Sequence, residues 1–281
     1  MDCSALVSAT ADSLRKAGAE IEFLVCDRLF CELYSHQPRS TDSCKGAYER
    51  ACVLLNKLAQ AAPSFSITEN PVKFEIENGI SASQAPWGRL YAHNPNYPPP
   101  PTPNDSWLMG VEEEIGAKHW TAEIPPETRQ RLRDLGAMQP DSELWPLINR
   151  LVCKEYSQEQ VQGDSLTFFL SRAKECGWVV SGNFLPQPDW LCFGHTRVWR
   201  AYDYFVTIRH QGEAPAKKKS ANLYFDMFHV ACMAVCDGLL SADQVMLNMA
   251  WACWPQKRER LYALDNQTGD VILYKPTWRE S

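Results

Sequence analysis

Three aspartates lie within one largely apolar stretch of this chain. The stretch is NLYFDMFHVACMAVCDGLLSAD, residues 222–243, and it carries Asp226, Asp237 and Asp243. Burying an unpaired carboxylate costs free energy, so carboxylates in an apolar segment indicate a hydrogen-bond network, a cationic side chain or a metal ion as partner. Clustered oxygen ligands suit Mg²⁺ or Mn²⁺. In the plainer interpretation, Asp226 and Asp243 cap helices and Asp237 is a turn residue.

The elements expected around these aspartates would bring two of them together. The pattern predicts a helix from Tyr224 to Cys236, a short buried strand over 238–240 and a second helix over 243–254. Asp226 would open the first helix, and Asp243 would follow the carboxyl end of the strand, where open parallel sheets bind ligands. Mutual repulsion there would raise both pKa values unless a cation is bound.

The first third of the chain alternates between helix and strand patterns. A helix-forming stretch ends at Gly18, an apolar strand pattern covers Ile21 to Val25, and the next helix is expected over 41–62. This rhythm, repeated in the last third, favours an α/β fold around a sheet.

The middle of the chain has a different pattern. We expect residues 79–220 to be a large α+β insertion into a smaller core, with a proline-rich loop over 94–103 in polyproline II conformation. Within it, the sequence predicts helices over 128–137 and 141–157. It also predicts a helix from Asp164 to Gly177 that runs into a strand, and a further strand over 198–210. Near the C-terminus, residues 260–274 have the pattern of a hairpin.

The stretch around the aspartates resembles the C-terminal motif of PIN-domain nucleases. In that motif an acidic residue opens an apolar helix, and a turn, a short strand and Ser/Thr-x-Asp follow. Here these positions are Asp226, Asp237, Ser241 and Asp243. The opening MDCSALVSA looks like the motif that ends the first PIN strand, with Asp2 and Ser4 facing the metal. IEFLVCDRLFCEL is similar to the second strand and its helix, with Glu32 as the acidic residue.

The resemblance implies a single PIN-like domain over residues 1–281, a three-layer α/β fold with a parallel central sheet. It implies metal-dependent hydrolysis of phosphodiester bonds, usually in RNA. The implied ligands of one or two Mg²⁺ or Mn²⁺ ions are four carboxylates: Asp2, Glu32, Asp226 and Asp243. Asp237 would be a supporting carboxylate, Ser4 and Ser241 would donate hydrogen bonds to a ligand or a metal-bound water, and His229 would pack in the helix. The family's first strand should precede Asp2, so a start upstream of Met1 is one expectation.

An RNA-cleaving protein with a net charge of −6 needs a local basic surface. Lys217, Lys218 and Lys219 lie just before the Asp226 helix. Basic residues also alternate with aromatic residues between positions 197 and 210: Arg197, Arg200, Arg209 and His210 with Trp199, Tyr202, Tyr204 and Phe205. Such a mixture binds phosphates and stacks unpaired bases. The alternative is a solvated lysine loop and a strand whose aromatic residues belong to the core.

The composition is that of an ordinary globular protein, with 45% hydrophobic and 22% charged residues. Eleven cysteines without a CxxC pair indicate buried free thiols rather than disulfides or a zinc site. No stretch resembles a secretory signal or a membrane span, so we expect a cytoplasmic protein that does not contact the membrane.

Two alternatives to an RNA nuclease remain open. One is an inactive PIN-like module that binds nucleic acid, including single-stranded DNA, or a protein partner or inhibitor. The other is an unrelated α/β interaction protein whose segment NPNYPPPPTPNDSW binds an aromatic-lined groove.

Overall fold

The structure is a computed structural model, and it describes residues 5, 8–20, 22–26, 53, 57, 64–68, 71–85, 88–91, 124–138, 141–209, 225–265, 267–276 and 278. Several residues named above lie outside these ranges: Asp2, Ser4, Glu32, His210, Lys217, Lys218, Lys219, the proline-rich loop 94–103 and most of the expected helix 41–62.

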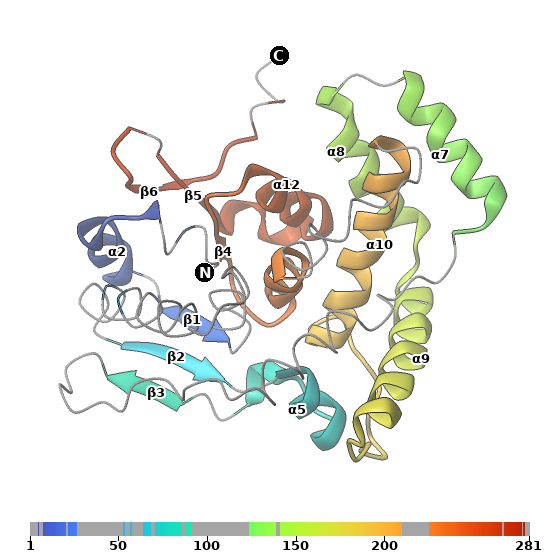
Figure 1. Cartoon of the computed structure of the whole chain (residues 1–281), viewed down its shortest axis with the longest axis horizontal. Coiled ribbons are helices and arrows are strands. Elements are labelled where there is room, and N and C mark those ends of the chain that lie inside the picture. The colour runs from blue at the N-terminus through green and yellow to red at the C-terminus, as the bar shows by residue number, and fades with distance from the viewer. Residues whose placement is uncertain are drawn as a thin grey trace, which may run out of the picture.

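The chain folds into a mixed arrangement of helices and strands in which helices dominate (Figure 1). Within the described residues, six short strands form two sheets of three strands each. In the first, β1 (Phe23–Cys26) pairs in parallel with β2 (Ser64–Thr68), which pairs antiparallel with β3 (Gly88–Tyr91). In the second, β4 (Leu239–Leu240) pairs in parallel with β5 (Leu261–Leu264), which pairs antiparallel with β6 (Val271–Leu273).

The expectation of one parallel central sheet is therefore wrong for the described residues, although each sheet contains one parallel pair. The expected hairpin near the C-terminus is confirmed, and its tight turn explains why β6 is antiparallel. Asp265 accepts hydrogen bonds from the backbone N–H groups of Gln267 and Thr268, and Gly269 takes the left-handed conformation at φ 69°. A turn this short reverses the chain, so the strand after it returns beside β5.

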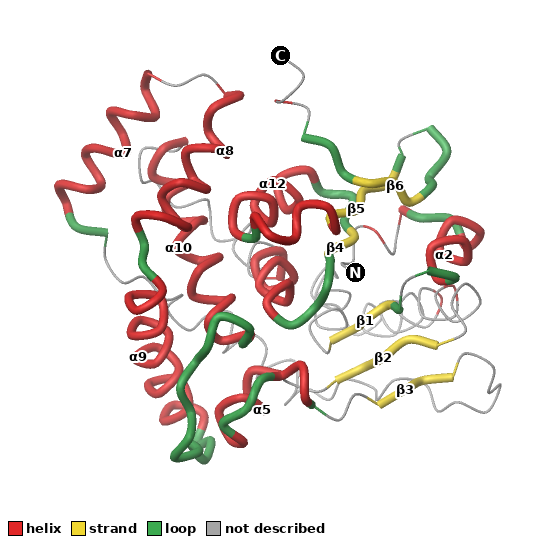
Figure 2. Tube along the Cα trace, turned by 180° about the vertical axis from the view of Figure 1, so that it is seen from behind, coloured by secondary structure: helices red, strands yellow, loops and turns green. Residues whose placement is uncertain are grey.

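Helices make up most of the remaining structure (Figure 2). The α-helices are α2 (Ala11–Gly18), α5 (Pro71–Asn78), α7 (Pro126–Met138), α8 (Asp141–Arg150), α9 (Gln158–Cys176), α10 (Leu191–Arg209) and α12 (Gln244–Cys253). Short helical turns are η1 (Ala82–Gln84), the π-helix η2 (Leu151–Glu155), η3 (Cys232–Ala234) and η4 (Pro255–Arg260). Residues 225–231 are also helical and are called helix 225–231 below.

The strand predicted over 198–210 is wrong for the described residues, because 198–209 belong to α10. Their β-branched and aromatic residues favour strands in isolation, but tertiary packing overrides that preference. Trp199, Tyr202 and Phe205, spaced three apart, form a chain of ring contacts along the helix, with centroids 5.7 and 6.3 Å apart. That spacing is a helical signal.

The helix expected to begin at Asp164 begins earlier, at Gln158. Ser157 and Gln160 form a capping box there, each side chain bonding the other residue's backbone N–H. The predicted stop at Gly177 is confirmed, with φ 67°. The described residues directly after it, 178–186, form no strand, which corrects the second half of that prediction.

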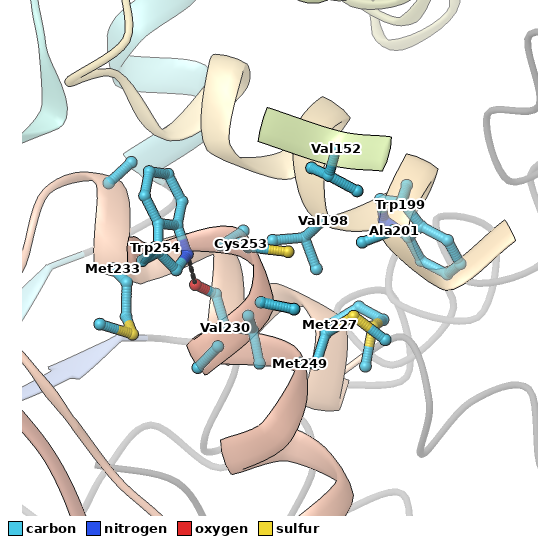
Figure 3. Packing of buried hydrophobic residues seen from close by; sticks show 14 of the residues in the cluster. Val152, Val198, Trp199, Ala201, Met227, Val230, Met233, Met249, Cys253 and Trp254 are labelled. Carbon is cyan, nitrogen blue, oxygen red and sulfur yellow. Dashed lines mark hydrogen bonds between the residues drawn. The ribbon is translucent and has the colours of Figure 1, made fainter. Parts of the chain in front are cut away.

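One hydrophobic core joins the middle of the chain to its last third. It includes Val152 of η2, Val198 of α10, Met227 and Val230 of helix 225–231, and Met249 of α12 (Figure 3). The backbones approach closely where α10 meets helix 225–231. A Cβ atom on Gly194 would lie 2.8 Å from the carbonyl oxygen of Ala231, so only glycine fits there.

A buried carboxylate anchors the start of α10. Glu75 of α5 is fully buried. It accepts hydrogen bonds from the backbone N–H groups of Ala82 (2.9 Å), Leu191 (2.7 Å) and Cys192 (2.8 Å). The first N–H groups of a helix have no partner within it, so a carboxylate from another segment satisfies them. Burial raises the pKa of Glu75 to about 7, although these N–H groups act to lower it.

We expect Glu75→Gln to flatten the pH dependence of stability. The folded pKa of about 7 exceeds the ordinary value of 4.5, so the folded chain binds this proton more tightly. The stability that this provides is fully present below the ordinary pKa and is lost as the pH rises through 7. Between these limits, the free energy of unfolding of the wild type should fall by about 3 kcal/mol relative to that of the variant. Urea unfolding at pH 4, 5.5, 7 and 8 measures this difference, and two parallel curves would contradict it.

Candidate functional site

Helix 225–231 precedes β4 in the chain, and α12 follows it. Residues 235–238 connect η3 to β4, and residues 241–243 connect β4 to α12. Connections this short reverse the chain, so helix 225–231 and α12 each run antiparallel to β4 and hence parallel to each other. Figure 3 shows the indole N–H of Trp254, the residue after α12, donating to the carbonyl of Val230 in helix 225–231. Asp226 and Asp243 are therefore on the side of the carboxyl end of β4.

Asp243 is the N-cap of α12, as the plainer interpretation predicted. Its Oδ1 accepts from the backbone N–H groups of Val245 (2.7 Å) and Met246 (3.2 Å). The buried Ser241 fixes the residue from the other side, since its Oγ accepts from the N–H of Asp243 at 2.9 Å. No described residue donates a hydrogen bond to Oδ2 of Asp243. A cap and a ligand role are compatible, because the cap uses one oxygen and holds the other in place.

Asp226 is half-buried and stands second in helix 225–231, between the buried Phe225 and Met227. The residues before Phe225 lie outside the described ranges, so it stays a prediction that Asp226 opens this helix. His229, three residues on, is buried at 4% exposure, as expected for a residue that packs in the helix.

Asp237 lies in the turn between η3 and β4, and its side chain is 92% exposed. Its Oδ2 lies 3.8 Å from the guanidinium of Arg260, an exposed pair of a kind that contributes little to stability. This is the position of a turn residue, the plainer of the two interpretations of Asp237.

The described residues supply two of the four expected metal ligands, since Asp2 and Glu32 lie outside them. Among the described residues, no group of three or more histidine, cysteine, aspartate or glutamate side chains is close enough to hold an ion. The two carboxylates present are oxygen donors of the kind that Mg²⁺ and Mn²⁺ prefer. The donor chemistry of Asp226 and Asp243 suits such an ion, and the binding of one by the four carboxylates stays a prediction.

Arg197 and Arg200, expected at a nucleic-acid surface, are buried on α10 at 9% and 6% exposure. The Arg197 guanidinium lies over the rings of Phe193 and Trp254, 5.1 and 5.3 Å from their centroids. Arg200 lies 3.6 Å from Asp164, which also accepts a 2.6 Å hydrogen bond from the Tyr156 hydroxyl. Both arginines stabilise the helical core through ring and carboxylate contacts, and their burial removes the reason for placing them against phosphates.

Asp203, also on α10, is a titratable group that the sequence did not reveal. Burial raises its pKa to about 7, while Arg200 and Arg129 act to lower it. A perturbed carboxyl marks a functional site in some proteins and a structural ion network in others. Asp203 lies near two arginines, as in a structural network of charged groups. In the sequence it follows Arg200 by three positions, and this spacing places both residues on one face of a helix.

The cysteines are free thiols where the structure describes them. Cys192 and Cys253 are buried, as expected, and burial raises the pKa of both thiols. Cys176 is exposed, which corrects the expectation of burial, because it occupies the solvent-facing last position of α9.

Comparisons with known proteins identify no relative. No family model, no curated protein and no solved structure matches the chain. Across the described residues, none of the helices combines the length and the apolar character needed to cross a bilayer.

We expect Asp243→Ala to lower the free energy of unfolding by about 1 kcal/mol and Asp243→Asn to leave it nearly unchanged, since asparagine also caps helices. Asp237→Ala is the matched control: it removes an exposed aspartate of the same segment and should change stability by less than about 0.5 kcal/mol. Urea unfolding measures all three variants. Equal losses for Asp243→Ala and Asp237→Ala would contradict the capping role.

Proposed function

We propose that this chain is a PIN-like nuclease that hydrolyses phosphodiester bonds of RNA with Mg²⁺ or Mn²⁺. The observation that supports the proposal is the place of two carboxylates on successive elements: Asp226 lies in helix 225–231, and Asp243 follows β4 and caps α12. The order helix, strand, Ser-x-Asp, helix and parallel strand supports the family resemblance. Asp2 and Glu32 complete the proposed ligand set.

The chain's own residues have distinct roles in this proposal. A bound divalent ion supplies an activated water and stabilises charge on the attacking and leaving oxygens. Asp243 is oriented for binding because its Oδ1 is held by two backbone N–H groups. Ser241 holds the Asp243 backbone, and we assign to Ser4 a hydrogen bond to a ligand or a bound water. Asp237 is not included, because it lies before β4 in the turn beside Arg260.

The RNA needs a cationic contact near these carboxylates. Lys217, Lys218 and Lys219 precede helix 225–231 in the sequence, and we assign the phosphate contacts to them. Arg197 and Arg200 are not included, because their side chains are buried in the helical core.

The test is cleavage of a single-stranded RNA by the full chain with Mg²⁺ or Mn²⁺. Asp226→Asn and Asp243→Asn should each lower the cleavage rate by about a hundred-fold or more, because each removes a charged metal ligand. Asp265→Asn is the matched control: this exposed turn aspartate belongs to the β5–β6 hairpin and should cleave at the wild-type rate. Circular dichroism spectra of all variants confirm folding, and a chelator should abolish wild-type cleavage.

Other outcomes separate the alternatives. Wild-type rates in both Asp226→Asn and Asp243→Asn would show the assignment to be wrong. Salt-dependent RNA binding without cleavage under any divalent ion would identify the inactive nucleic-acid-binding module instead. Cleavage of a single-stranded DNA of matched sequence tests whether the activity requires ribose in the substrate.

A further inference from the structure

A lysine ammonium closes the turn between helix 225–231 and β4. Nζ of Lys257 donates to the backbone carbonyl oxygens of Met233 (2.6 Å) and Cys236 (2.7 Å), with that of Ala234 at 3.5 Å. The last carbonyls of a helix have no partner within it. One half-buried side chain therefore satisfies the polar groups at which this helical segment ends.

The same lysine belongs to the segment that ends α12. The backbone N–H of Lys257 bonds the carbonyl of Trp254 at 2.9 Å, and its own φ of −116° bends η4 at that point. The Trp254 indole N–H donates to the carbonyl of Val230 at 3.1 Å (Figure 3). Residues 254 and 257 thus join the ends of α12 and helix 225–231 at two points.

The turn itself is packed tightly against this segment. A Cβ atom on Gly238, which leads into β4, would collide with the carbonyl oxygen of Arg260 in η4. The turn has little room to shift while these contacts hold, so the contacts define where helix 225–231 ends relative to α12.

These contacts lie at the ends of the two helices remote from Asp226 and Asp243. A helix is a stiff rod, and α12 with its ten residues is about 15 Å long, so fixing one end of the pair limits the positions available at the other. We propose that Lys257 is a positioning residue that sets helix 225–231 against α12 so that the carboxylates of Asp226 and Asp243 bind one divalent ion. This inference rests on the proposed function.

The simpler role for Lys257 is to stabilise a helix end, and Arg258 provides the matched control for that role. Arg258 also follows α12, its Nε donates to the carbonyl of Trp251 at 3.1 Å, and its guanidinium stacks 3.4 Å from the centre of the Trp251 ring. That carbonyl belongs to α12 itself. Losing Arg258 therefore weakens a helix end and leaves the hydrogen bonds of Lys257 and Trp254 to residues 230–236 in place.

The experiment measures Mn²⁺ binding to the full chain, with free Mn²⁺ followed by electron paramagnetic resonance, alongside urea unfolding. Lys257→Met keeps the aliphatic stem and removes the ammonium. We expect it to weaken Mn²⁺ binding by about ten-fold or more, whereas Arg258→Met should bind within about two-fold of the wild type. Asp226→Asn is the reference for loss of a ligand, and Lys257→Met should also require more Mn²⁺ for half-maximal cleavage.

The outcomes distinguish this inference from the proposed function. If the wild type binds Mn²⁺ and Lys257→Met binds it equally well while losing stability, the positioning role is overturned and the nuclease proposal stands. If the wild type binds no Mn²⁺, both are overturned. Should Lys257→Met fail to fold, Trp254→Phe removes the indole N–H donated to Val230, together with part of the buried ring, and carries the same expectation for Mn²⁺ binding.

Discussion

The structure depends on the hydrogen bonds made by the backbone N–H groups at the buried start of α10. A helix that enters a core exposes N–H groups without partners, and leaving them unbonded costs free energy. Glu75 removes this cost for Leu191 and Cys192 and also bonds Ala82, so one carboxylate brings α5, η1 and α10 to a single point. Since α10 packs against α7, α9, α12 and η3, its position determines where the segment with the candidate carboxylates can lie.

That segment is held between α10 and α12 by contacts that are apolar along its length and polar at its ends. Gly194 lets α10 approach the backbone of Ala231, which leaves no space for a larger residue. At the far end, Trp254 and Lys257 bond carbonyls that would otherwise be buried without partners. At the near end, Asp243 caps α12. Charge is therefore confined to the ends of these helices, and the end near the carboxyl side of β4 is acidic.

Much of the last third could be predicted from the sequence alone. The short strand over 239–240, the helix capped by Asp243 and the final hairpin occur where the pattern predicted them. The helix predicted from Tyr224 to Cys236 is α-helical over 225–231 and continues as η3 to Ala234. The structure of the middle of the chain differs more from the prediction. A strand was predicted over 198–210, but residues 198–209 are helical because their aromatic side chains pack, buried or partly buried, in the helical core. The start of α9 was missed because the capping box at Ser157 was not recognised, although its Ser-x-x-Gln pattern was present.

The sequence by itself determined the features that depend on a few neighbouring residues. The cap at Asp243, the stop at Gly177 and the turn after Asp265 each depend on one side chain or one φ angle and its immediate neighbours. The tertiary structure alone decided that Arg197 points into the core, and that Glu75 bonds Leu191, 116 positions away. Partners so far apart meet only through the packing of whole helices, and no local pattern carries that information.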